Sequence, residues 1–157
     1  MAASPRFINP ATLAKPPGYT YVVETSGPGR TVYIAGQLGL DLNNNLVAND
    51  FRAQAGKAIE NLKAALAAVG ADLKDVVKIN NYLTDMTHIG IFREVRDQFF
   101  NMAAPPASTT VAISQLARPG ALFEIEAIAV LPPAKTAKPA KARGAAKKAK
   151  AARRKRK

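Results

Sequence analysis

The stretch Leu122-Phe-Glu-Ile-Glu-Ala-Ile-Ala-Val-Leu131 decides the fold, because it predicts a strand that is apolar on both faces. Successive side chains of a strand point to opposite sides of the sheet. Phe123 and every second residue after it would then line one face, and Leu122, Ile128 and Val130 would lie on the other. A sheet with two apolar faces needs a cover on each side.

Upstream of this strand, the spacing of apolar residues predicts two helices and four more strands. One helix begins after Asp50 as its N-cap and stops at Gly70, and a second begins after Thr87 and carries its apolar stripe through Phe99. The other predicted strands cover residues 19–24, 30–35, 76–83 and 108–115. The first two form a hairpin about the turn at 26–29, so the order is β-β-α-β-α-β-β, an α+β fold.

Each predicted helix has a single apolar face, so both helices pack on one face of a single mixed sheet. The second face of the sheet then has no cover within one chain. Self-association is the simplest way to bury such a face.

Composition excludes several classes of site. The 157 residues contain no cysteine, which rules out disulfides and thiolate metal sites. His88 is the only histidine and is predicted to be a capping or surface residue, so no metal site is expected. No apolar run approaches the ~18 residues of a membrane span. Residues 1–10 lack the apolar core of a signal peptide, and the expected compartment is the cytoplasm.

Charge and proline content together divide the chain into three parts. Residues 132–157 hold 12 of the 23 Lys and Arg residues and no acid, whereas the rest of the chain holds 11 bases and 11 acids. Because this tail has no large apolar side chain, it is predicted to be disordered. Residues 1–18 are rich in proline and predict an extended arm, which leaves 19–131 as the folded domain.

The basic tail has two interpretations. In the first, it contacts nucleic acid by neutralising phosphates and so associates the protein with the nucleoid. In the second, it is a solubilising extension that binds any polyanion weakly. The candidate nucleic-acid contacts are Lys147, Lys148, Arg153, Arg154 and Arg156. No aromatic residue stands among these charges, so base stacking by the tail is not expected.

Glu124 and Glu126 lie two residues apart on the mainly apolar second face of the last strand. Burial there would raise their proton affinity and suit a general acid or base, unless they are solvated or salt-bridged. Two further candidates are weaker. Gly36 follows a predicted strand end, where backbone N–H groups can face a ligand. Arg93 and Arg96 on the second helix favour surface solvation over anion capture.

Six segments carry a resemblance to a known family. They are Ala35-Gly-Gln37, Gln54-Ala-Gly-Lys-Ala-Ile-Glu-Asn-Leu62, Val77-Lys-Ile-Asn-Asn-Tyr-Leu-Thr-Asp-Met86, Arg93-Glu-Val-Arg-Asp-Gln-Phe-Phe100, Pro106-Ala-Ser-Thr-Thr-Val111 and Glu124-Ile-Glu-Ala-Ile-Ala-Val130. With them the chain resembles the RidA/YjgF family, also called the L-PSP or reactive-intermediate deaminase family. The resemblance implies a fold like chorismate mutase of the trimeric bacterial type. Three subunits would then surround a central barrel, with ligand pockets at the subunit interfaces.

The resemblance also implies a reaction without metal or cofactor. Deaminases of this family hydrolyse 2-imino or 2-enamino acids, such as 2-iminobutanoate and 2-iminopropanoate, to 2-keto acids and ammonia. By position, Glu124 matches the glutamate that orients water and Gly36 matches the pocket glycine. Tyr19, or Tyr21, matches the pocket tyrosine, and Thr110 stands where the family often has cysteine.

One departure bears on the substrate. The family's Pro-Ala-Arg-Ser becomes Pro106-Ala-Ser-Thr109, so Ser108 replaces the arginine that grips the substrate carboxylate. Either Arg93 supplies the missing cation, or the natural ligand has no carboxylate.

Three functional hypotheses remain from the sequence. The chain is a RidA-like hydrolase that adds water to a small imine, enamine or related carbonyl compound. Alternatively it is a non-catalytic trimer that binds a small ligand, or a nucleic-acid-associated protein that acts through its tail.

Removing the tail tests the last hypothesis. The full chain is expected to bind double-stranded DNA with an affinity that falls steeply as salt rises, because its cations release counterions. A version ending at residue 131 is expected to bind more weakly and with a flatter salt dependence. Fluorescence anisotropy across a salt series measures both, and equal affinities for the two versions would rule out binding by the tail.

Overall fold

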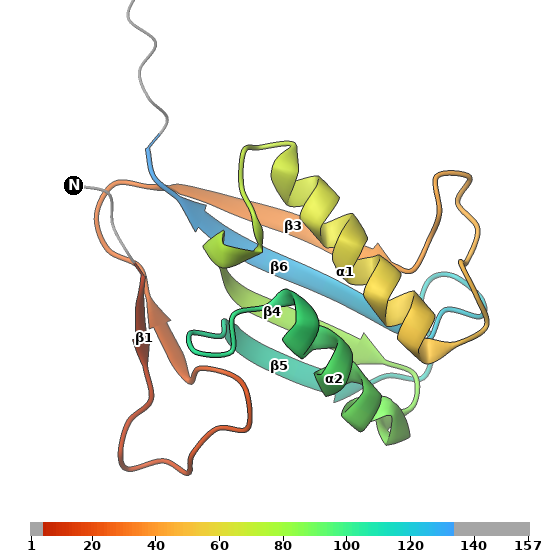
Figure 1. Ribbon diagram of the computed structural model, residues 1–157, viewed down its shortest axis with the longest axis horizontal. Coiled ribbons are helices and arrows are strands. Elements are labelled where there is room, and N and C mark those ends of the chain that lie inside the picture. Colours follow the sequence, from red (N-terminus) through yellow and green to blue (C-terminus); the bar gives the residue numbers. More distant parts are fainter. Residues whose placement is uncertain (1–4, 134–157) are drawn as a thin grey trace, which may run out of the picture.

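The doubly apolar strand is β6 (Phe123–Leu131), and it lies inside a four-stranded sheet in the order β3-β6-β4-β5. The computed structural model describes residues 5–133 (Figure 1). The other strands of this sheet are β3 (Arg30–Leu38), β4 (Val76–Leu83) and β5 (Ala107–Ala112). Strand β6 is antiparallel to both of its neighbours, whereas β4 and β5 run parallel, so the sheet is mixed as predicted.

Two helices, α1 (Phe51–Ala67) and α2 (Ile89–Phe99), lie on the same face of the sheet (Figure 1). Every second residue of β6, starting at Phe123, is buried against them, and the alternate residues on the other face are half-buried. The α+β class and the placement of both helices on one face are confirmed. Within residues 5–133, no helix is both long and apolar enough to cross a bilayer.

The predicted hairpin between the first two strands is wrong. Strand β2 (Val22–Glu24) pairs with β1 (Arg6–Ile8) in a separate two-stranded sheet, which lies beside the main sheet (Figure 1). Strand β3 pairs with β6 instead. Residues 6–8 contain no proline, so each has a backbone N–H group that can join a ladder, although Pro5 and Pro10 flank them. An Arg6–Glu24 ion pair also joins the two short strands.

Two local predictions also need correction. Strand β3 does not end at Ala35 but continues through Gly36 and Gln37 to Leu38, with an irregularity in its pairing with β6 between Ile34 and Gln37. The second helical segment is capped by Asp85 rather than Thr87. The Asp85 side chain accepts a hydrogen bond from the Thr87 N–H at the start of a short 3₁₀ helix, η2 (Met86–His88), that leads into α2. A similar 3₁₀ turn, η1 (Leu73–Asp75), precedes β4.

His88 occupies the N-cap position of α2, but its side chain makes no capping hydrogen bond. Its ring stacks on Phe51 of α1, with 4.5 Å between the ring centroids. The residue therefore joins the two helices rather than capping one of them.

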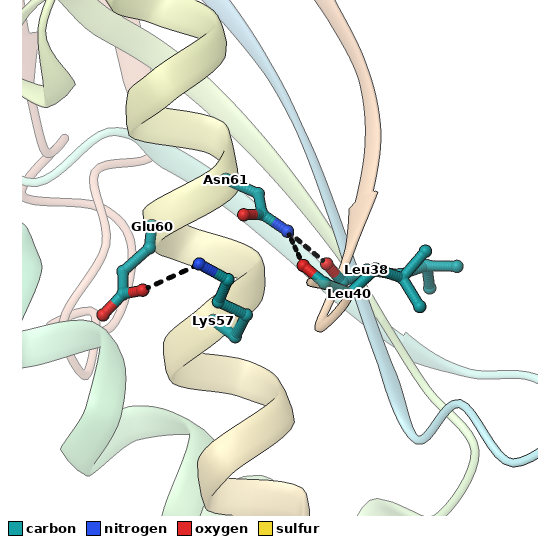
Figure 2. A network of polar contacts seen from close by, with 5 residues as sticks. All are labelled: Leu38, Leu40, Lys57, Glu60 and Asn61. Atoms are coloured by element: carbon teal, nitrogen blue, oxygen red, sulfur yellow. Dashed lines mark hydrogen bonds and ion pairs between the residues drawn. The ribbon is translucent and has the colours of Figure 1, made fainter. Parts of the chain in front are cut away.

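Two amides on α1 hold the loops around the sheet. Asn61 donates hydrogen bonds to the carbonyls of Leu38 (3.0 Å) and Leu40 (2.9 Å), next to the Lys57–Glu60 ion pair on the same helix (Figure 2). These bonds fix the chain as it leaves β3, two residues beyond Gly36.

Gln54 is fully buried and connects three segments. Its Nε2 donates to the carbonyls of Ala48 (2.9 Å) and Gly120 (3.1 Å), and its Oε1 accepts from the Leu122 N–H (2.8 Å). One side chain thus satisfies two backbone groups just before β6 and one just before α1.

Replacing this glutamine tests its structural role. Gln54→Leu leaves two carbonyls and one N–H without partners, so the free energy of unfolding is expected to fall by about 2–4 kcal/mol in urea denaturation. Gln98→Leu on the exposed side of α2 is the matched control, with an expected change within about 0.5 kcal/mol. Equal stability of the two variants would contradict this role.

Candidate functional site

Glu124 lies on the face of the sheet away from the helices, beside Gly36 of β3. Its carboxylate is so close to the backbone there that a Cβ atom at residue 36 would overlap Glu124 Oε1. Only a glycine leaves this space open without a shift of the acid. The predicted pair of Gly36 and Glu124 is therefore brought together within one chain.

A second acid, Glu126, lies two residues further along the same face. Its Oε1 accepts hydrogen bonds from Asn80 Nδ2 (2.7 Å) and from the Tyr82 hydroxyl (3.0 Å), both on β4. The Glu124 carboxyl accepts no hydrogen bond from any of the described residues. The two carboxyls of the pair therefore have different surroundings.

These surroundings shift two pKa values. Burial raises the pKa of the Glu124 carboxyl above its ordinary value, and the nearby negative charge of Glu126 raises it further. The hydrogen bond to Glu126, followed by burial and the charges of both acids, raises the pKa of the Tyr82 hydroxyl. Glu124 is thus the carboxyl whose proton affinity is tuned upward.

A hollow of about 400 Å³ lies on this open face. Its lining includes Tyr33 and Ala35 of β3, Lys78 and Asn80 of β4, and Glu126 of β6. Burial lowers the pKa of the Lys78 ammonium. Tyr33 is 77% exposed, so this face carries a large aromatic side chain that no part of residues 5–133 covers.

A different cavity, of about 360 Å³, lies on the helix side of the sheet. Four of the predicted ligand-binding residues line it, namely Tyr19, Arg93, Ser108 and Thr110. The remaining lining residues are Pro17, Met86, Ile89, Phe92 and Arg96. Of the two candidate tyrosines, Tyr19 is the one at the cavity.

The position of Tyr19 follows from the residue after it. Thr20 is buried, and its hydroxyl donates a 2.6 Å hydrogen bond to the Pro105 carbonyl while its N–H bonds the Pro106 carbonyl at 3.3 Å. These bonds attach the segment before β2 to the start of β5. Pro17 and Tyr19 consequently form a wall of the cavity.

The two hydroxyls in the cavity are held by Asn81 of β4, which is fully buried. Its Nδ2 lies 3.1 Å from Ser108 Oγ, 3.2 Å from Thr110 Oγ1 and 3.0 Å from the Thr109 carbonyl. Its Oδ1 is buried and has no hydrogen-bond partner among residues 5–133. The amide fixes where both hydroxyls stand on edge strand β5.

The predicted site residues therefore form two groups on opposite faces of the sheet. Gly36 and Glu124 lie on the open face, while Tyr19, Arg93, Ser108 and Thr110 lie beneath α2. The predicted nucleic-acid contacts Lys147, Lys148, Arg153, Arg154 and Arg156 fall outside the described residues. Within residues 5–133, no three acidic or histidine side chains gather as a metal-binding cluster would.

Sequence reasoning missed three polar residues of these two groups. Asn80 and Asn81 are not among the predicted site residues, yet alternation along β4 places Asn81 on the apolar side with Ile79, which signals a buried amide. Arg96 was interpreted as a surface residue. It stands four positions after Phe92, hence on the same helix face, and that spacing is the signal that was available.

Comparison with known proteins gives the family relation. The family model described as endoribonuclease L-PSP matches residues 12–131. Protein DfrA of Myxococcus xanthus is 41% identical over 113 residues, which cover 71% of this chain and 84% of the relative. A 2-iminobutanoate/2-iminopropanoate deaminase of Dermatophagoides farinae is 34% identical over 131 residues, covering 82% of this chain and 98% of that protein.

Solved structures show the same relation. The Rid-family protein YyfB of Yersinia pestis superposes with a TM-score of 0.75 at 35% identity, covering 81% of this chain and 98% of that one. E. coli TdcF with bound serine superposes with a TM-score of 0.59 at 30% identity, covering 67% of this chain and 89% of that one.

The shifted carboxyl generates a prediction about pH. Glu126→Gln removes one of the two causes of the shift, so the pKa of Glu124 is expected to move down but to stay above its ordinary value, because burial is the larger cause. Carbon-detected NMR titration of the carboxyl measures this change. Glu60→Gln on the exposed side of α1 is the control and leaves the pKa of Glu124 unchanged.

The same shift has a stability consequence with a definite sign. A carboxyl whose pKa is raised on folding binds its proton more tightly in the folded state, so the free energy of unfolding falls as pH rises through the pKa of Glu124. This decrease is expected to be smaller in Glu126→Gln. An unchanged pH profile together with an unchanged pKa would contradict the assignment.

Proposed function

Because this chain belongs to the endoribonuclease L-PSP family, the RidA/YjgF family of the resemblance above, we propose that it hydrolyses a small imine or enamine with Glu124 as the group that orients and activates water. The observation that carries the proposal is the Glu124 carboxyl. It is half-buried beside Gly36, it accepts no hydrogen bond from the described residues, and its pKa is raised.

In this reaction the Glu124 carboxylate would accept and return a proton. Water adds to the carbon of the C=N bond while Glu124 accepts a proton from that water, and the nitrogen is protonated. The resulting carbinolamine then collapses to a carbonyl compound and ammonia, so that one imine and one water give one ketone and one ammonia. A carboxyl whose pKa is raised by burial suits both the acceptance and the return of a proton.

Two relatives support this class of substrate. A mite protein that is similar over 82% of this chain is named for deamination of 2-iminobutanoate and 2-iminopropanoate. E. coli TdcF, of similar fold, has been solved with bound serine. Both names point to small compounds built on an amino-acid skeleton.

The positions of the two residue groups favour a site shared between copies of the chain. Glu124 and Ser108 lie on opposite faces of the sheet, so a single chain does not present both to one small ligand. We propose a homotrimer in which Gly36 and Glu124 of one copy face the cavity beneath α2 of the next. The uncovered Tyr33 on the open face, and Val111 on edge strand β5, agree with burial against a second copy.

A single substitution tests the reaction. The wild-type chain is expected to speed the loss of 2-iminobutanoate, generated in situ and followed by ammonia release, and Glu124→Gln is expected to lower the rate by about 100-fold or more. Glu60→Gln is the matched control, because Glu60 is exposed on α1, which packs on the face of the sheet opposite to Glu124, and this variant is expected to keep the wild-type rate.

Two results would overturn the proposal. One is a wild-type rate equal to that of buffer alone, which would favour a ligand-binding protein without catalysis. The other is sedimentation of the purified chain as a single copy, which would leave Glu124 and the cavity residues apart.

A further inference from the structure

We propose that Arg96 is the anion-binding residue of the cavity beneath α2, and that the ligand it holds is a small carboxylate. The proposal rests on the proposed function only for the reaction that the ligand undergoes. The binding of a carboxylate in this cavity stands on separate observations and is tested separately.

The first observation is the burial of a cation at a cavity. Arg96 is 5% exposed and lines the 360 Å³ space together with Tyr19, Ser108 and Thr110. Taking a guanidinium out of water is costly unless its N–H groups find partners. Among the described residues, its hydrogen bond and ion pair go to one atom, Asp97 Oδ1, at 2.8 Å from Nε and 2.7 Å from Nη2. A guanidinium carries five N–H donors, so donors remain for a ligand.

The second observation is that the guanidinium is held in place. Its central carbon lies 5.7 Å from the centroid of the Phe92 ring, one helical turn earlier. On another side, the backbone at Gly18 approaches so closely that a Cβ there would overlap Arg96 Nη2, and Gly18 has a positive φ of 90°. A pre-oriented planar fork loses little freedom when it binds a carboxylate through two parallel hydrogen bonds.

The third observation is the charge of the cavity. Its nine lining residues include two arginines and no acid. Neither Asp97, which pairs with Arg96, nor Glu94, which pairs with Arg52 of α1, is among these lining residues. Asn81 holds the Ser108 and Thr110 hydroxyls in place, and these add neutral hydrogen-bonding groups beside the cation. An anion is the ligand that this set of groups complements.

Ser108 takes on a new meaning in this arrangement. An arginine at position 108 would bring a third guanidinium into the space that Arg93 and Arg96 already line. The small serine avoids this repulsion and leaves room for a ligand. The cation has therefore moved from strand β5 to helix α2 rather than being lost.

Arg93 is the rival for this role. It lines the same cavity, but it is exposed, so water and salt screen its charge. The sequence left two alternatives, Arg93 as the substitute cation or a ligand without a carboxylate. The burial of Arg96 assigns the stronger interaction to the residue one turn further along α2.

The experiment measures binding of 2-oxobutanoate, a stable keto acid, to the full chain by calorimetry, with uncharged 2-butanone as the comparison ligand. The wild type is expected to bind 2-oxobutanoate and not 2-butanone. Arg96→Gln is expected to weaken binding by about 10- to 100-fold. Arg93→Gln is expected to weaken it less, and Arg30→Gln, an exposed arginine on β3, is the matched control that keeps wild-type affinity. The double variant Arg96→Gln/Ser108→Arg is expected to recover binding, because it returns the cation to β5.

A second measurement uses only the wild-type chain, so it does not depend on whether a variant folds. In the wild-type chain, the Nε–H resonance of Arg96 is expected to shift on titration with 2-oxobutanoate and to stay still with 2-butanone. The proposal is overturned if Arg96→Gln binds as well as the wild type, if only the Arg93 resonance shifts, if 2-butanone binds equally well, or if the wild type does not bind 2-oxobutanoate. Carboxylate binding that depends on Arg96 in a chain that leaves 2-iminobutanoate untouched would uphold this inference and refute the hydrolase.

Discussion

The alternation of side chains along β6 is the constraint on which the rest of the molecule depends. Phe123 and Ile125 fill the core beneath the helices, and the residue between them is therefore turned to the opposite face. This places Glu124 next to Gly36 in a half-buried position, where its proton affinity rises. The same pattern that stabilises the fold thus also creates the acid of the site, and a shift of one residue in register would exchange the two roles.

Sequence reasoning predicted the main sheet well because its signals are long and redundant. The apolar stripe of α1 extends over several helical turns, and its members Phe51, Ile59 and Leu66 are buried as expected. The alternation of β4 likewise extends over the whole strand, and its core-facing residues are buried. The hairpin at 19–35 failed for the opposite reason. A strand of three residues has little pattern of its own, and two neighbouring strands with a glycine turn predict pairing whether or not a better partner is available. Strand β3 pairs with β6 at seven positions, and β2 pairs with residues 6–8 instead.

The candidate site was predictable in its members but not in its grouping. Strand alternation placed Glu124 on the second face, whereas nothing in a linear sequence showed that Ser108 would face α2. The burial of Arg96 was hidden because charged residues are usually exposed, and its environment depends on Gly18, which is 78 positions away in the chain. Contacts made by such distant segments follow from the folded topology rather than from local spacing.

The attachment of Thr20 to Pro105 and Pro106 has a consequence for how this fold diversifies. One wall of the cavity, formed by Pro17 and Tyr19, comes from a segment that contributes no strand to the main sheet. Replacements in that segment alter the size and polarity of the binding space while the hydrophobic interior stays intact. Substitutions at Pro17 and Tyr19 are therefore expected to change which ligands fit the cavity while the chain still folds.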